Sequence, residues 1–171
     1  DNLTLAFIRW DESQVPMYSM TMFEGACSPN KDYALYPGRF DFKYPVAGEK
    51  NSDVSVMCYD VENRTLKKAK LPDGVDYYIP HMAFSGDATK LMVSTLNRTQ
   101  NDFHIYAVNP RSLIAKSVYA EKSDTWFDSE LANSVCYYGT YFVIPSEKSG
   151  FTQLYQYSLS GALMKQLTTG N

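Results

Sequence analysis

Short runs of alternating apolar and polar residues follow one another along the whole chain, and one of them recurs at a fixed interval. Matching runs begin at Val56, Ile105 and Leu154, each 49 residues after the one before. A polar turn and a second short alternating run follow each of them. Strict alternation over a few residues indicates a half-buried strand, and a repeat of this length is typical of β-propeller blades.

A further strand-like run lies upstream of each recurring run. In the middle repeat we expect four antiparallel strands, at about 77–84, 90–96, 103–108 and 113–119. The pattern predicts an all-β fold made of about three consecutive four-stranded blades of a larger propeller. We expect the blades at about 1–71, 77–122 and 128–171. Short alternating strands also fit a β-sandwich, but the regular period disfavours it. No helical periodicity extends over 11 residues, so we expect very little helix.

The first repeat differs from the others by a long insertion. Its first strand is missing, and about 37 additional residues, from about 17 to 53, separate its second and third strands. The insertion is rich in aromatic residues, which a disordered linker would lack. Alternation over residues 39–44 predicts a strand, so we expect a structured hairpin arm with one apolar face. We expect this arm to contact a second copy of the protein through Phe40, Phe42, Tyr44 and Pro45; the alternative is that the arm folds back on its own blade.

The composition narrows the classes of partner. The net charge is −3, and no basic stripe with interleaved aromatic residues is present, so we expect no nucleic acid partner. The cysteines Cys27, Cys58 and Cys136 are too few and too widely spaced for a disulfide framework or a zinc site. We expect Cys58 and Cys136 to be small core residues, and we expect no metal and no cofactor. The abrupt start, within a strand pattern and without methionine, predicts a segment of a longer protein.

Few residues suggest chemistry. The sequence contains no nucleophile elbow, zinc-protease motif, P-loop or dinucleotide fingerprint. Of its two histidines, we expect His104 on a strand in a surface or packing role, and His81 on the innermost strand of its blade as a wall residue of the central channel. Trp126 and Phe127 lie between the second and third repeats, where they either pack the interface between blades or wall a ligand cavity.

Five segments, in order along the chain, resemble the propeller domain of the dipeptidyl peptidase IV family of prolyl oligopeptidase-type serine peptidases. They lie at residues 7–16, 44–51, 96–101, 146–155 and 165–170. The second, for example, is Tyr-Pro-Val-Ala-Gly-Glu-Lys-Asn, similar to the family's Y-P-K-A-G-x-x-N. The fourth departs from the family at Ser149 and Gln153, where Asp and His are usual, and this affects loop contacts rather than the fold. The sequences of these segments are most similar to those of bacterial members of the family, of the Bacteroidetes type.

The resemblance implies an eight-bladed propeller over a C-terminal α/β-hydrolase domain that carries the catalytic serine, aspartate and histidine, none of them in this chain. The parent protein would release X-Pro or X-Ala dipeptides from the amino termini of peptides. This segment would gate, scaffold and help to dimerise the parent, and would be inactive alone. The glutamate pair that binds the substrate amine would precede Asp1. Trp126 and Phe127 would lie near the substrate.

The same resemblance implies a periplasmic or other extracytoplasmic location, with membrane association in the parent compatible with it. The alternative is a non-catalytic periplasmic binding or scaffold propeller of the TolB type. A G-x-S-x-G motif downstream of Asn171 would distinguish the peptidase from this alternative.

Overall fold

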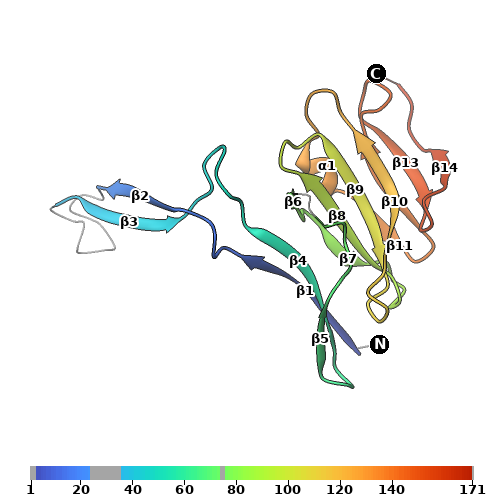
Figure 1. Ribbon diagram of the computed structural model, residues 1–171. Helices are drawn as coiled ribbons and strands as arrows, with labels where there is room; N and C mark the ends of the chain where they lie inside the picture. The colour runs from blue at the N-terminus through green and yellow to red at the C-terminus, as the bar shows by residue number, and fades with distance from the viewer. Residues whose placement is uncertain (1–2, 24–35, 74–75, 171) are drawn as a thin grey trace. The chain divides into compact units, whose positions relative to one another are not determined.

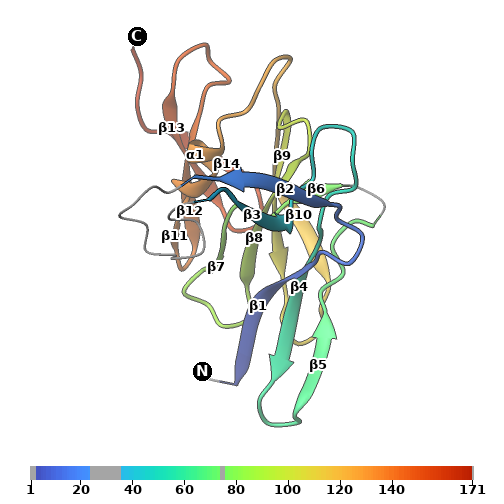
Figure 2. The same cartoon turned by 90° about the vertical axis from the view of Figure 1, so that its left-hand side faces the viewer.

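The structure is a computed structural model that describes residues 3–23, 36–73 and 76–170. It divides into two compact units, one made of Asp1–Arg9 with Val54–Asn171 and the other of Trp10–Asp53. The larger unit contains three antiparallel sheets that follow one another along the chain. The smaller unit contains a two-stranded ribbon (Figures 1 and 2). The prediction of an all-β propeller segment with a hairpin insertion is confirmed.

The first sheet has three strands, in the order β1-β4-β5. These are β1 (Thr4–Asp11), β4 (Asp53–Asp60) and β5 (Thr65–Lys68). The turn between β4 and β5 is closed by Asp60, whose carboxylate accepts hydrogen bonds from the backbone N–H and the side-chain amide of Asn63. The insertion leaves the sheet between β1 and β4, which are neighbours in space although they are far apart in the sequence.

The second sheet contains β10 (Ala115–Lys122), β9 (Asp102–Val108) and β8 (Leu91–Asn97). Both β6 (Tyr77–Tyr78) and β7 (Met82–Phe84) pair with β8. The single strand expected over residues 77–84 is therefore wrong. Proline has no N–H to donate to a ladder, and Pro80 lies at the interruption between β6 and β7. The last strand also continues three residues beyond its expected end at residue 119, to Lys122.

The third sheet has four strands, in the order β11-β12-β13-β14. They are β11 (Cys136–Tyr138), β12 (Tyr141–Ser146), β13 (Gln153–Ser158) and β14 (Leu163–Gln166). A helix of five residues, α1 (Ser129–Asn133), precedes them, and Asp128 caps its N-terminus by accepting a hydrogen bond from the Glu130 N–H. No helix in the part of the chain that the structure describes is long and apolar enough to cross a membrane.

Two apolar clusters fill the spaces between successive sheets. Val56, Leu91 and Val108 belong to the cluster between the first and second sheets. Phe103, Phe142 and several other aromatic residues belong to the cluster between the second and third sheets. Propeller blades cover each other's faces in this way, so each sheet depends on its neighbours for burial.

The cysteines differ in their surroundings. Cys58 is a buried member of the first cluster, as expected, and burial raises the pKa of its thiol. Cys136 is exposed at the start of the inner strand β11, so its expected core role is wrong. A strand-like sequence does not decide which of its residues meet a neighbouring sheet. Cys27 lies outside the described residues.

Close backbone contacts tie the second sheet to the third at two places. The Gly139 N–H donates a 2.7 Å hydrogen bond to the Ser85 carbonyl oxygen. At the second place, the turn before β14 approaches a bulge of β10, and a Cβ added to Gly161 would lie 2.4 Å from the Val118 carbonyl oxygen. Gly161 has a φ of +98°, so both its conformation and its surroundings require glycine.

The smaller unit contains the ribbon formed by β2 (Met17–Met22) and β3 (Gly38–Lys43). Their register places Tyr18 opposite Phe42 and Met20 opposite Phe40 on one face. The other face carries the polar group, in which Arg39 contacts Asp41 at 2.6 Å and donates to the Ser19 hydroxyl. The strand expected over residues 39–44 corresponds to β3, and the ribbon has one apolar and one polar face.

Candidate functional site

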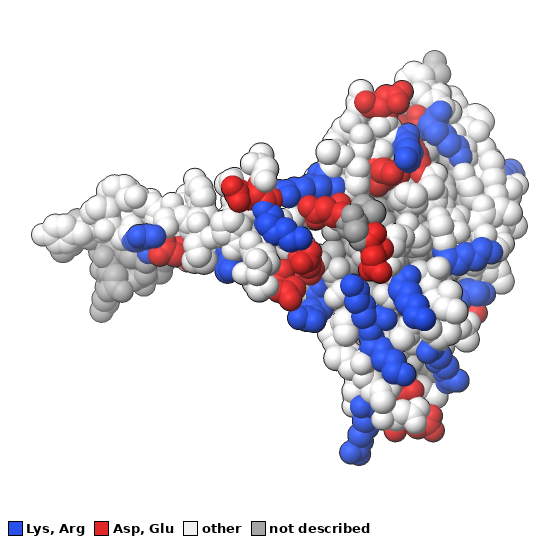
Figure 3. Space-filling view, in the orientation of Figure 1, with Lys and Arg blue, Asp and Glu red and all other residues white. Residues whose placement is uncertain are grey.

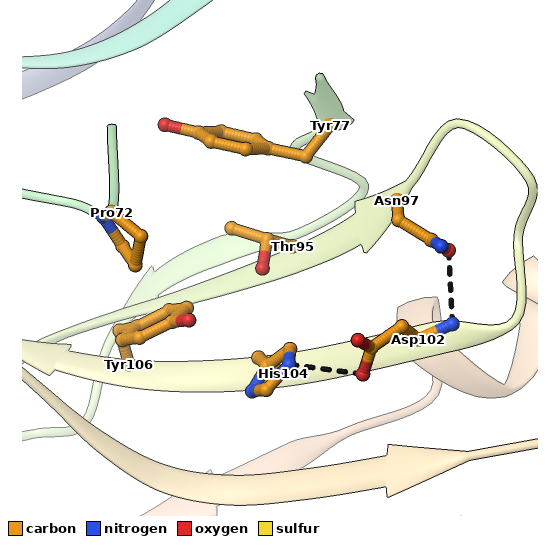
Figure 4. Close-up of a pocket in the computed structure, with 7 residues that line it drawn as sticks. All are labelled: Pro72, Tyr77, Thr95, Asn97, Asp102, His104 and Tyr106. Carbon is orange, nitrogen blue, oxygen red and sulfur yellow. Dashed lines mark hydrogen bonds and ion pairs between the residues drawn. The ribbon is translucent and has the colours of Figure 1, made fainter. Parts of the chain in front are cut away.

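A pocket of about 100 Å³ opens on the face of the second sheet (Figure 4). Its residues come from β6, β8, β9 and the segment before β6. They are Pro72, Tyr77, Thr95, Asn97, Asp102, His104 and Tyr106. Alternate residues of a strand point to the same face, and this places the side chains of Asp102, His104 and Tyr106 in one row along β9.

Asp102 is the charged centre of this pocket. Its Oδ1 atom lies 3.0 Å from Nε2 of His104, and its Oδ2 atom lies 3.2 Å from Nζ of Lys122. Its backbone N–H donates a 2.9 Å hydrogen bond to the side-chain oxygen of Asn97. The carboxylate is thus held between two basic side chains, and its position is determined by the turn from β8 to β9.

The rest of the pocket is aromatic and hydroxylated. Tyrosine hydroxyl groups are protonated at neutral pH and can donate hydrogen bonds, and burial raises the pKa of Tyr77 and Tyr106 further. The His104 ring stacks on Tyr106, with ring centroids 5.7 Å apart. Such a pocket can bind a small polar group that fits between hydroxyl donors and a carboxylate acceptor.

Nucleophilic catalysis in this pocket would require a hydroxyl or thiol in contact with the histidine. The free ring nitrogen of His104, Nδ1, is buried and has no hydrogen-bond partner among the described residues. The nearby hydroxyl of Thr95 is therefore not joined to it as a nucleophile to a base. Within residues 3–23, 36–73 and 76–170, no cluster of three or more His, Cys, Asp and Glu side chains is arranged to hold a metal ion.

A second, more polar pocket of about 100 Å³ lies where the second and third sheets meet, and Trp126 and Phe127 both contribute to it. Trp126 is 54% exposed, and its Nε1 donates a 3.0 Å hydrogen bond to the side-chain oxygen of Gln100. Phe127 is 4% exposed and stacks on Phe103, with ring centroids 4.6 Å apart. Only Trp126 therefore offers a broad surface to a ligand, and the substrate-proximal role of the pair stays a prediction.

Gln100 and Glu121 position the walls of this second pocket. The backbone oxygen of Gln100 accepts a 2.7 Å hydrogen bond from the Phe127 N–H, so this one residue holds both aromatic residues. The Glu121 carboxylate accepts hydrogen bonds from the hydroxyl groups of Tyr119 and, at 2.9 Å, Ser146. Burial, followed by the contact with Glu121, raises the pKa of Tyr119 far above its usual value.

His81 lies against the third sheet. Its ring is parallel to that of Tyr137, with centroids 5.9 Å apart, and burial lowers the pKa of His81. Nδ1 of His81 is buried without a hydrogen-bond partner among the described residues. The neutral imidazole is thus part of the contact between two sheets. Its expected place on the wall of a central channel stays a prediction.

The four residues predicted for the dimer contact lie on or directly after β3. Phe42 is within 5.9 Å, centroid to centroid, of the rings of both Phe40 and Tyr44. Phe40 is 50% exposed and Tyr44 is 52% exposed. They form the exposed apolar face of the ribbon together with Tyr18, and Pro45 follows Tyr44 in the chain. Phe40, Phe42 and Tyr44, three of the four residues predicted for the dimer contact, therefore lie next to one another.

Asp102, Gln100 and Glu121 were not among the residues predicted from the sequence. The alternation of Asp102, His104 and Tyr106 within one predicted strand was a usable signal for the first pocket. Gln100 lies in the third of the five family-like segments, at a turn position with φ of +55°. No local pattern indicates that Glu121 would meet a serine of the next sheet.

The chain matches the family described as "Dipeptidyl peptidase IV (DPP IV) N-terminal region" over residues 1–171. The protein named "Probable dipeptidyl peptidase 4" from Emericella nidulans is 28% identical over 186 residues, covering 99% of this chain and 23% of the relative. The crystal structure of Porphyromonas gingivalis dipeptidyl peptidase 4 is 42% identical with a TM-score of 0.87, covering 99% of this chain and 23% of that one.

A crystal structure of a protein from Bacteroides ovatus shares the fold, with a TM-score of 0.78 at 22% identity. The chain spans about a quarter of the length of these relatives. Because the family match extends over every residue, and the sheets of the larger unit follow one another as propeller blades do, the chain belongs to the dipeptidyl peptidase IV N-terminal region family.

Proposed function

We propose that this chain is a propeller segment of a serine-type exopeptidase that releases X-Pro and X-Ala dipeptides from the amino termini of peptides. The observation that carries the proposal is the family match over residues 1–171, together with 42% identity to the P. gingivalis dipeptidyl peptidase 4. In this proposal the catalytic serine, aspartate and histidine belong to a C-terminal α/β-hydrolase domain of the same protein, in an extracytoplasmic compartment such as the periplasm.

In this proposal, the segment supports the hydrolase domain as a scaffold and controls the access of peptides to it. The packed interface of the second and third sheets provides rigidity, because Phe103, Phe142 and Ile144 are fully buried there. Trp126, held at its indole nitrogen by Gln100, is the residue that we place nearest to the peptide substrate. A rigid rim with one exposed aromatic side chain suits the selection of extended peptides.

The direct test is an assay of the full-length protein that contains this chain. Purified protein is incubated with Gly-Pro and Ala-Ala p-nitroanilides, with and without a serine-directed phosphonylating reagent. The proposal expects release of p-nitroaniline that the reagent abolishes. A folded full-length protein that hydrolyses neither substrate, or that hydrolyses them in the presence of the reagent, would contradict it.

We also propose that the apolar face of the ribbon contacts a second copy of the protein. A two-stranded ribbon is marginally stable in water by itself, and the exposed Tyr18, Met20 and Phe40 form a continuous apolar surface on one side of it. A two-fold contact needs only one self-complementary patch. The polar face, with its Arg39–Asp41 ion pair, provides the internal control for this proposal.

Adjacent residues of β2 test the contact, because they point to opposite faces of the ribbon. Met20→Lys places a charge on the apolar face, whereas Thr21→Lys adds the same charge to the polar face. Sedimentation velocity of the full-length protein is expected to show monomers for Met20→Lys and dimers for Thr21→Lys. Equal dimerisation of both variants would exclude the apolar face as the interface.

A further inference from the structure

Trp126 combines a large exposed surface with a hydrogen-bonded ring nitrogen. It is 54% exposed at the rim of the second pocket, which residues of α1 and of the β12–β13 turn also line. Its Nε1 donates a 3.0 Å hydrogen bond to the side-chain oxygen of Gln100. Because the indole has a single N–H, and this N–H is already engaged, the remaining part of the ring is apolar. A ligand therefore meets an apolar surface at Trp126, and not a hydrogen-bond donor.

The backbone around Gln100 is fixed by the turn between β8 and β9. The Gln100 N–H donates a 2.9 Å hydrogen bond to the Asn97 carbonyl oxygen. The side-chain oxygen of Asn97 accepts two more, each of 2.9 Å, from the N–H groups of Asn101 and Asp102. Gln100 itself has a φ of +55°, a left-handed conformation that a residue with a side chain keeps only where the surrounding contacts hold it. The side chain of Gln100 thus extends from a rigid backbone.

Three hydrogen bonds join this turn to the segment between β10 and α1. The Ser123 N–H donates to the Asn101 carbonyl oxygen at 2.9 Å, and the Phe127 N–H donates to the Gln100 carbonyl oxygen at 2.7 Å. These two bonds between backbone groups hold the course of the segment. The third bond, from Trp126 to the Gln100 side chain, acts on the indole itself. Substitution of the Gln100 side chain can therefore release the ring while the segment stays in place.

Charged residues of both signs line the second pocket. Figure 3 shows both acidic and basic side chains at the upper end of the larger unit, where β10 ends in Figure 1. Two of the acidic side chains have internal roles, because Glu121 accepts a hydrogen bond from Ser146 of the next sheet and Asp128 caps α1. With both signs present, the apolar surface of Trp126 is the more selective feature of this rim.

We propose that Gln100 is a positioning residue for peptide binding: it keeps the N–H of Trp126 directed at the β8–β9 turn, so that the apolar part of the ring stacks on apolar side chains of the peptide. This inference rests on the proposed function, in which Trp126 is the residue nearest to the substrate. In this arrangement Gln100 touches neither the peptide nor the reacting atoms. Its loss should therefore weaken the binding of substrate and transition state alike, which raises KM and leaves kcat unchanged.

A purely structural hydrogen bond makes a different prediction. If the bond only stabilised the segment between β10 and α1, its loss would lower the free energy of unfolding without changing which peptides bind. If the bond positions the ring, its loss frees a polar N–H beside the peptide and reduces the preference for apolar side chains. Leucine and asparagine side chains are similar in size but differ in polarity, so two peptides that differ only in these residues distinguish the two roles.

The experiment measures kcat and KM of the full-length protein with the peptides Leu-Pro-Leu-Leu and Asn-Pro-Asn-Asn, and the released dipeptide is quantified by chromatography. Gln100→Leu removes the hydrogen-bond acceptor and keeps the approximate size of the side chain, whereas Gln100→Glu keeps an acceptor oxygen. Trp126→Phe removes the donor and keeps an aromatic ring. Gln14→Leu, at an exposed position of the smaller unit, is the control for the substitution itself.

We expect Gln100→Leu to raise KM for the leucine peptide about three- to tenfold, the factor that one hydrogen bond typically contributes, with kcat unchanged. Its preference for the leucine peptide over the asparagine peptide should fall. Gln100→Glu and Gln14→Leu should behave like the native protein. In the Trp126→Phe protein, Gln100→Leu should have no further effect, because it acts through the indole N–H.

Fluorine NMR follows the ring without an assay of activity. In protein that contains 5-fluorotryptophan, the signal that is lost in Trp126→Phe identifies Trp126, and it should shift in Gln100→Leu but not in Gln14→Leu. An unchanged signal, an unchanged KM in an active protein, or an equal effect of Gln100→Leu in the Trp126→Phe protein would overturn the proposal. A native protein that cleaves neither peptide would contradict the proposed function, and with it the binding role of Gln100, even if the fluorine signal shifts.

Discussion

The strand β8 and the strand β3 show how differently two strands of one chain can be used. Both segments were predicted as strands from their sequences. In β8 the first six of seven residues are buried, because apolar clusters cover both faces of the second sheet. In β3 four of six residues are exposed, including Phe40, although its aromatic content is higher. Strand formation thus depends on local pattern, whereas burial depends on whether another sheet is present.

The comparison predicts that stability resides in the packed sheets. Phe103→Ala removes a fully buried ring that stacks on Phe127 and contacts Tyr119. We expect the free energy of unfolding to fall by about 3–5 kcal/mol, as is usual for large-to-small changes of buried aromatic residues. Urea unfolding of the full-length protein, followed by circular dichroism, measures it. A loss below about 1 kcal/mol would mean that the second and third sheets do not share this core.

The next largest loss of stability should come from a substitution where the turn before β14 contacts strand β10. In Gly161→Ala the new Cβ would meet the Val118 carbonyl oxygen, and the residue would keep a positive φ. We expect a loss of roughly 2–3 kcal/mol from overpacking and backbone strain together. Gly150→Ala is the matched control, because Gly150 has a φ of +95° but open space around it, and it should lose only about 1 kcal/mol. Equal losses in the two variants would refute the close contact.

The contact of His81 with Tyr137 should make stability depend weakly on pH. Burial lowers the pKa of His81 below its usual value of 6.5, so the unfolded chain binds a proton that the folded chain does not. Stability from this residue is complete above pH 6.5 and is lost as the pH falls through the lower, folded-state pKa. Unfolding measured at pH 7 and pH 5 should show a smaller difference in His81→Gln. An unchanged difference would exclude His81 as a source of the dependence.

The ribbon should contribute least to stability. Phe40→Ala removes a ring that is half exposed, with Phe42 beside it on β3 and Met20 opposite it on β2. We expect the free energy of unfolding to change by less than about 0.5 kcal/mol in the monomer. The measurement is urea unfolding at a concentration at which the protein is monomeric. A loss as large as that of Phe103→Ala would show that the ribbon is packed against a core.

The sequence was sufficient for the elements that local patterns specify. The interval of 49 residues predicted matching strands at residues 56, 105 and 154, and these positions fall in β4, β9 and β13. The alternation of residues 39–44 predicted β3, because a period of two puts apolar side chains on one face. The interruption at Pro80 could have been predicted too, since proline cannot donate to a ladder.

Less of the candidate sites than of the fold could be predicted from the sequence. Trp126 and Phe127 are adjacent in sequence and equally aromatic, but one is exposed and the other is in the core. The family-like segments indicated the region around Gln100, but not that its side chain would hold the indole of Trp126. These contacts join residues 25 or more positions apart, and no short-range pattern encodes them.

The sequence by itself determined the strand class, the repeat, the insertion and the resemblance to the dipeptidyl peptidase IV family, because these depend on periodicity and on the order of motifs along the chain. Only the tertiary structure decided that Asp102 meets Lys122, that Cys136 is exposed, and that Gly161 must remain glycine. The physical reason is that a strand specifies two faces, whereas the neighbouring strands and sheets determine what each face touches.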